Sequence, residues 1–135
     1  MTDFIIETDN GVIQAEKWAD PDCPGITVYV NGDQVVVAEC DELDHPGRFL
    51  VKMWSNPDID AVFEVIYDNL EEREAIEAMI EIDTSAGTIS ATEIENGVGV
   101  FLDGNLSIEI VSENGGIRST AYYPGTDRIE FEILI

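Results

Sequence analysis

Two loops carry closely spaced carboxylates that could, by residue type, bind a divalent cation. Asp20 and Asp22 form one pair, Asp58 and Asp60 form the other, and each pair lies beside a proline. Ca²⁺ and Mg²⁺ take hard oxygen ligands of this kind, but neither pair has the spacing, the glycine and the closing glutamate of an EF-hand loop. Close pairs of acids also arise by chance in a chain with 29 of them. We therefore expect no metal site and no cofactor.

The residues that could act as nucleophiles or soft metal ligands are few. His45 is the only histidine, and Cys23 and Cys40 are the only cysteines. A structural zinc site needs four ligands at tight spacings, and a catalytic thiol needs a base beside it. The phosphate-binding, dinucleotide-binding, nucleophile-elbow and zinc-protease motifs are absent. We predict that the chain is not an enzyme, with a small carboxylate or metal-dependent enzyme as an alternative.

Acidity is the strongest chemical feature of the chain. Its 29 Asp and Glu residues oppose six Lys and Arg residues, which gives a net charge of −23 over 135 residues. Such a charge repels nucleic acid and anionic membranes and attracts basic proteins or cations. Asp3 and Glu7 fall where a signal peptide would be apolar, and no apolar run reaches the length of a membrane span. We predict a cytoplasmic partner of a basic protein that contacts neither nucleic acid directly nor a membrane.

Three groups of acids are candidates for the binding surface: one in a loop, one on a predicted helix and one on strands near the C-terminus. Like charges directly opposite one another destabilise a sheet, so an array of strand acids would need a compensating basic partner. The candidate protein-binding residues are Asp41, Glu42 and Asp44 in the loop, Glu71, Glu74, Glu77 and Glu81 on the helix, and Glu109, Glu130 and Glu132 on the strands.

A duplicated β unit is the expected scaffold for these acids. Residues 25–33 begin with glycine, continue as a β-run and turn at Asn-Gly, and residues 97–105 repeat this order with Asp-Gly. These dipeptides are strong signals for a hairpin. Upstream, Gly11 is echoed by Gly87 in similar surroundings. The alternative is that a β protein repeats its turn chemistry by chance, but echoes in the same order favour duplication.

One helix is expected to join the two units. Asn69 and Glu72 fit a capping box, and the residues that follow are strong helix formers with apolar side chains at helical spacing. For residues 60–67, which fit a strand or a helix, the echo of Phe63 by Phe131 favours a strand. We predict a mainly antiparallel α+β fold with about five strands in each unit. The predicted single domain, 1–135, consists of a first β unit at 1–68, a helix at 69–82 and a second β unit at 83–135.

The function predicted from charge and architecture is that of an acidic protein-binding module. In charge and size, though not in sequence, the chain is similar to acidic accessory proteins of phages and mobile elements. Some of these present carboxylates in place of DNA phosphates and inhibit restriction or CRISPR enzymes. This implies an intracellular viral DNA mimic of the anti-CRISPR type that binds a basic, nucleic-acid-binding host enzyme. The alternative is a structural or assembly protein whose acids provide solubility.

Overall fold

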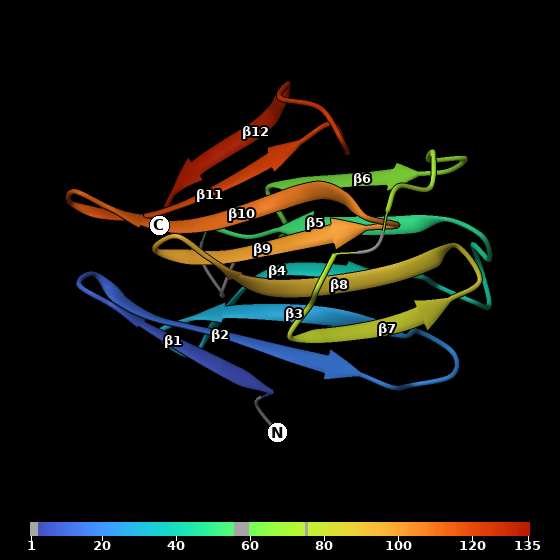
Figure 1. Ribbon diagram of the computed structural model, residues 1–135, viewed down its shortest axis with the longest axis horizontal. Coiled ribbons are helices and arrows are strands. Elements are labelled where there is room, and N and C mark those ends of the chain that lie inside the picture. The colour runs from blue at the N-terminus through green and yellow to red at the C-terminus, as the bar shows by residue number, and fades with distance from the viewer. Residues whose placement is uncertain (1–2, 56–59, 75) are drawn as a thin grey trace.

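The computed structural model describes residues 3–55, 60–74 and 76–135. Within these residues the chain forms twelve strands, arranged as two six-stranded antiparallel sheets (Figure 1). In each sheet the spatial order of the strands follows their order along the chain. The first sheet contains β1 (Phe4–Thr8), β2 (Gly11–Trp18), β3 (Gly25–Val30), β4 (Asp33–Glu39), β5 (Phe49–Met53) and β6 (Phe63–Tyr67). The second contains β7 (Ile80–Thr84), β8 (Gly87–Ile94), β9 (Gly97–Leu102), β10 (Asn105–Glu113), β11 (Gly116–Tyr122) and β12 (Ile129–Leu134).

The α+β prediction is therefore wrong, because the described residues contain strands and no helix. Two similar units do fit the structure, with six strands in each instead of about five. The second unit begins inside the predicted helix, since β7 starts at Ile80. Residues 60–67, predicted as a strand, contain β6.

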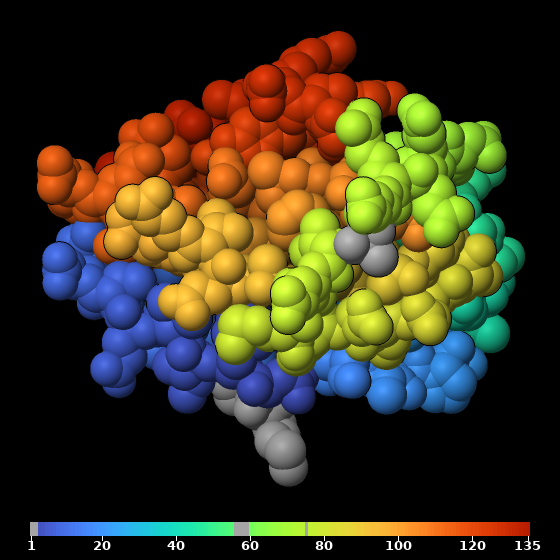
Figure 2. Space-filling view, viewed as in Figure 1, coloured from blue at the N-terminus to red at the C-terminus, as the bar shows by residue number. Residues whose placement is uncertain are grey.

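The segment predicted as a helix binds the second sheet through its backbone instead. Asn69 adopts a left-handed conformation, with φ of 54°. The amide of Arg73 donates to the carbonyl of Asp103 at 2.9 Å, and the carbonyl of Glu71 accepts from Asn105 Nδ2 at 2.7 Å. These bonds use groups that a helix would pair internally, and glutamates three or four positions apart would repel one another on a helix. We call residues 68–74 and 76–79 the connecting segment; Figure 2 shows this stretch of the chain lying over the second sheet.

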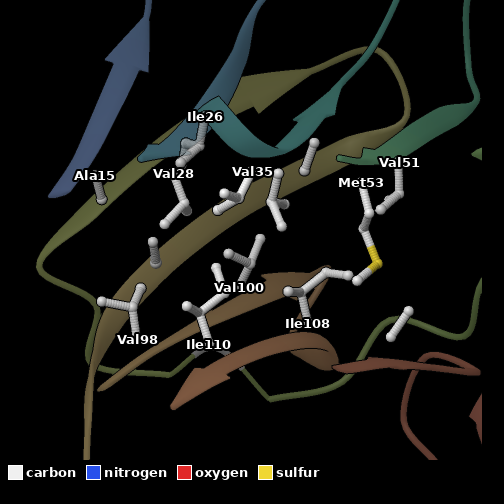
Figure 3. Packing of buried hydrophobic residues seen from close by; sticks show 14 of the residues in the cluster. Ala15, Ile26, Val28, Val35, Val51, Met53, Val98, Val100, Ile108 and Ile110 are labelled. Carbon is white, nitrogen blue, oxygen red and sulfur yellow. The ribbon is translucent and has the colours of Figure 1, made fainter. Parts of the chain in front are cut away.

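The core lies between the two sheets, which stack with β7–β12 in front of β1–β6 in Figure 1. Alternate residues of each strand point inward, as a half-buried sheet requires. Figure 3 shows Ile26 and Val28 of β3 facing Val98 and Val100 of β9 together with Ile108 of β10. All five are at most 1% exposed, so the centre is built from β-branched side chains that favour a pleated surface.

The equivalent hairpin turns of the two units have the same geometry. Asn31 and Asp103 both have positive φ, at 52° and 50°, as the first position of a type I′ turn requires. The side chain of Asn31 accepts from the Val12 amide at 2.9 Å, and the side chain of Asp103 accepts from the Thr88 amide at 2.9 Å. These shared bonds extend the likeness of the two units from sequence pattern to side-chain contacts.

Part of the packing between the two units resembles that in a two-fold dimer. In an isologous interface each contact has a reciprocal, and equivalent residues meet each other at the axis. The equivalent residues Phe63 and Phe131 stack with their ring centroids 5.2 Å apart. Reciprocally, β1 contacts β9 and β7 contacts β3. Each of the two similar units therefore buries its apolar face against the other.

Candidate functional site

The loop acids Asp41, Glu42 and Asp44 lie after β4, and two of them have roles within the chain. Asp41 Oδ1 accepts from the amides of Leu43 and Asp44 at 3.1 and 3.0 Å, which closes the turn. Glu42 reaches the other unit, where it accepts from the amide of Ser85 at 3.1 Å and also from the hydroxyl of that residue. Asp44 is exposed. Asp41 therefore fixes the loop and Glu42 joins the two sheets, whereas the carboxylate of Asp44 makes none of these bonds.

Glu42 has the clearest electrostatic perturbation among these acids. The thiol of Cys40 donates to its Oε1 at 2.8 Å. This bond and those from Ser85 lower the pKa of the Glu42 carboxyl below its ordinary value, since hydrogen bonds to a carboxylate favour its charged form. Glu42 thus acts as an ionised clamp between the end of the first sheet and the β7–β8 turn.

The predicted helix surface does not exist, so Glu71, Glu74, Glu77 and Glu81 do not share a helical face. The first three are exposed on the connecting segment. Glu81 lies on edge strand β7 and pairs in register with Ser90 of β8. All four residues are exposed, on or beside the second sheet.

The strand acids have compensating donors within the chain. Glu109 and Glu132 flank Thr120 in one cross-strand row on the outer face of the second sheet. Tyr122 donates its hydroxyl to Glu109 at 2.5 Å, and Tyr67 donates to Glu130 at 2.9 Å. Thr120 donates to Glu132 at 3.3 Å, and Arg118 lies 3.8 Å from the same carboxylate. A basic partner is therefore not required to hold these three acids together.

The hydroxyls that bind these acids are themselves perturbed. The bond to Glu109, followed by burial, raises the pKa of Tyr122 to about 12. Burial, followed by the bond to Glu130, raises the pKa of Tyr67 above its ordinary value. Both effects disfavour a second negative charge beside a carboxylate. The tyrosines therefore remain neutral donors over the physiological pH range.

A groove of about 920 Å³ lies elsewhere, at the end of the sandwich where three hairpin turns meet. These are the β1–β2, β8–β9 and β10–β11 turns, at the left of Figure 1. None of the described residues that line the groove is basic. Its five carboxylates, which define what we call the acidic groove, belong to Glu7, Asp9, Glu93, Glu95 and Glu113.

The walls of the acidic groove are fixed by hydrogen bonds from Asn10 of the first unit to the second unit and by a bond within the second unit. Asn10 Nδ2 donates to Ser112 Oγ at 2.8 Å and to the carbonyl of Glu113. The amide of Ser112 donates to the carbonyl of Asn96 at 2.8 Å. Among the described residues, Glu113 is the one groove acid with a cation close by, since Arg118 lies 3.0 Å away in an exposed pair. The groove thus combines a preformed shape with a high density of negative charge.

Our sequence analysis missed this groove, although a signal for it is present. An acid followed by Asn-Gly occurs three times, beginning at Asp9, Glu95 and Glu113. Each copy forms one of the three turns that line the groove. The turn chemistry was readable from the sequence, but the convergence of the three turns depends on how the two sheets stack.

The residues considered for metal binding or nucleophilic catalysis are not assembled into a site. Within residues 3–55, 60–74 and 76–135, no group of three or more His, Cys, Asp or Glu side chains is placed to hold a metal ion. Asp58 lies outside the described residues. Cys23 and Cys40 are both free thiols. Burial, together with a hydrogen bond to Glu39, raises the pKa of Cys23 to about 12, so its reactive thiolate form is suppressed.

Comparisons of the chain with protein-family models, curated proteins and solved structures found no match. In the part of the chain that the structure describes, no helix is long and apolar enough to cross a membrane. Any functional assignment must therefore be built from the shape and charge described above.

Proposed function

We propose that the chain is an acidic protein-binding module whose acidic groove receives a basic segment of a partner protein. The observation that carries this proposal is the convergence of five carboxylates in one groove, with no Lys, Arg or His among the lining residues that the structure describes. Lys and Arg side chains would complement this field, and the net charge of −23 would steer a basic partner toward the surface.

The same geometry supports a proteinaceous partner with clustered Lys and Arg, such as a nucleic-acid-binding enzyme. The chain exposes 7117 Å², which corresponds to about 300 Å² per net charge, whereas duplex DNA carries about one charge per 100 Å². Imitation of DNA therefore has to be local, and the acidic groove is where carboxylates are concentrated. In one form of this proposal, the carboxylates of the groove take the place of DNA phosphates and inhibit such an enzyme, as an anti-CRISPR protein does.

The test uses a deca-arginine peptide as the probe and calorimetric titration as the measurement. The variant Glu93→Gln/Glu95→Gln removes two groove charges, and Glu71→Gln/Glu74→Gln removes two exposed charges from the connecting segment as a matched control. At about 0.2–1 kcal/mol for each exposed pair, the groove variant should bind about fivefold more weakly and the control should stay close to the parent. Equal weakening of both variants would show that the charge is a diffuse coat, which favours the solubility alternative.

A second measurement addresses the inhibitor form of the proposal. The chain is used to capture proteins from the lysate of its own host at low salt and again at about 0.5 M salt, where the Debye length is only a few ångströms. Capture of a nucleic-acid-processing enzyme that is lost at high salt and with the Glu93→Gln/Glu95→Gln variant would support imitation of DNA. Capture that persists in that variant would remove the groove from this role.

A further inference from the structure

The outer face of the first sheet differs from the outer face of the second. The cross-strand row Glu16–Thr27–Val37–Lys52–Glu64 of the first sheet corresponds to the row Thr92–Gly99–Glu109–Thr120–Glu132 of the second. Each row crosses five strands at equivalent positions of the two units. The middle of the row is apolar in the first sheet, where Val37 stands at the position that Glu109 has in the second.

The neighbouring row of the first sheet carries three large apolar side chains. It runs from Trp18 through Gly25, Glu39 and Leu50 to Ile66. Trp18 and Ile66 are each 42% exposed. We call the outward surface formed by Trp18, Thr27, Tyr29, Val37, Leu50 and Ile66 the β2–β6 face.

The centre of the β2–β6 face already excludes water. Thr27 is 1% exposed although it points outward, and its hydroxyl has no hydrogen-bond partner among the described residues. Burial raises the pKa of Tyr29, and the charge of Glu16 adds to this effect. A desolvated centre bordered by polar residues is the arrangement that protein interfaces use.

Charge indicates which kind of partner this face fits. Three carboxylates, Glu16, Glu39 and Glu64, stand on the two rows with a single cation, Lys52. A second copy of the chain would bring another net charge of −23 against it, which opposes self-association. A partner with an apolar centre and basic margins would match both the centre and the rim.

The size of the β2–β6 face is suitable for the centre of an interface. With strands about 4.8 Å apart and rows about 7 Å apart, five strands and the two rows described above cover roughly 300 Å². A standard interface buries about 800 Å² on each partner, with an apolar centre and a polar rim. The face would therefore supply the centre, and the surrounding acids would supply the rim.

We propose that the β2–β6 face is a second contact surface, which binds a partner surface with an apolar centre and basic margins. It goes beyond the acidic groove, since its contacts depend on apolar burial and not only on charge. Because apolar burial is not screened by salt, binding through this face should persist at salt concentrations that abolish binding in the groove.

The test uses a synthetic amphipathic helix with Leu along one face and Lys along both margins. A scrambled peptide of the same composition, without an apolar face, is the control probe. In 0.5 M salt, the first peptide should bind and shift the emission of Trp18 to shorter wavelength in a Trp54→Phe background, whereas the scrambled peptide should not bind.

Two matched variants separate this face from the rest of the surface. Val37→Glu introduces the glutamate that the second unit carries at the equivalent position, Glu109. Thr92→Glu introduces on the second sheet the glutamate that the first unit carries at its equivalent position, Glu16. Both add one negative charge at a position whose equivalent in the other unit carries glutamate. Val37→Glu should weaken binding at least tenfold, and Thr92→Glu should change it less than twofold.

Each other outcome overturns the proposal. Equal weakening by both variants, equal binding of both peptides, or no binding of the amphipathic peptide in 0.5 M salt would exclude the β2–β6 face as the contact surface. Concentration-dependent dimerisation that Val37→Glu abolishes, measured by sedimentation, would assign the face to a second copy of the chain. None of these results depends on Glu93 or Glu95, so the groove proposal stands or falls separately.

Discussion

The turn glycines Gly32 and Gly104 allow the docking of the connecting segment to be measured. They occupy equivalent positions in the two units, with φ of 87° and 78°. A Cβ added at Gly32 would meet nothing within 4 Å, whereas a Cβ added at Gly104 would lie 2.8 Å from the carbonyl oxygens of Arg73 and Glu74. The same substitution therefore tests an identical turn with and without the connecting segment above it.

The expected effect differs between the two sites. Alanine in a left-handed conformation costs about 1 kcal/mol at either glycine. At Gly104 the connecting segment must also move, which breaks the Arg73–Asp103 and Asn105–Glu71 hydrogen bonds at about 1 kcal/mol each. Gly32→Ala should lower the free energy of unfolding by about 1 kcal/mol and Gly104→Ala by about 3 kcal/mol.

Thermal unfolding by circular dichroism is the assay. For a chain of this size, 1 kcal/mol corresponds to about 3 °C in Tm, so the losses should be about 3 °C for Gly32→Ala and about 10 °C for Gly104→Ala. Gly115→Ala, at φ of 90° with nothing within 4 Å, is a control that should match Gly32→Ala. Equal losses at Gly32 and Gly104 would refute the reasoning, because the connecting segment would then not be held against the turn in solution.

Three further predictions concern single contacts. In the parent protein, ionised Glu42 should add to the free energy of unfolding above pH ~4.3, and this contribution should be lost as the pH falls through the lowered pKa of Glu42. Glu42→Gln should remove the contribution, and Ser85→Ala should reproduce the change. Urea unfolding between about pH 3 and 6 checks both variants. Phe63→Leu and Phe131→Leu should destabilise the fold equally, and a double-mutant cycle should give a coupling of about 1 kcal/mol; additive losses would contradict stacking at the axis. Tyr122 should contribute stability that is lost between about pH 10 and 12, and an absorbance titration should lose a tyrosine transition near pH 12 in Tyr122→Phe.

The strands and turns were predictable because their signals are local. Alternation over residues 129–134 and the Asn-Gly and Asp-Gly turns specify hairpins within a few residues of sequence. The helix at residues 69–82 was wrong because its capping pattern and helix formers are also local, whereas the decisive contacts come from the turn at Asp103 and Asn105. Tertiary contacts outweigh intrinsic propensity in such a segment.

The candidate sites were less predictable than the fold, for a related reason. The acids chosen from sequence were those that cluster along the chain, and the loop and strand groups proved largely occupied by donors such as Ser85, Tyr67 and Tyr122. The acidic groove instead gathers carboxylates from three separate turns. Only the stacking of the two sheets brings these turns together, and no single window of sequence contains that information.

The simple strand order of the two sheets has a consequence for how the chain folds. Every pairing within a sheet joins strands that are neighbours along the chain, so each hairpin can form by closing a short loop. Sandwiches with Greek-key connections need long-range pairing before their sheets are complete, and folding slows as the sequence separation of contacts rises. Here only the meeting of the two finished sheets is distant in sequence. Folding of this chain therefore requires the local formation of two sheets, followed by a single long-range docking step between similar halves.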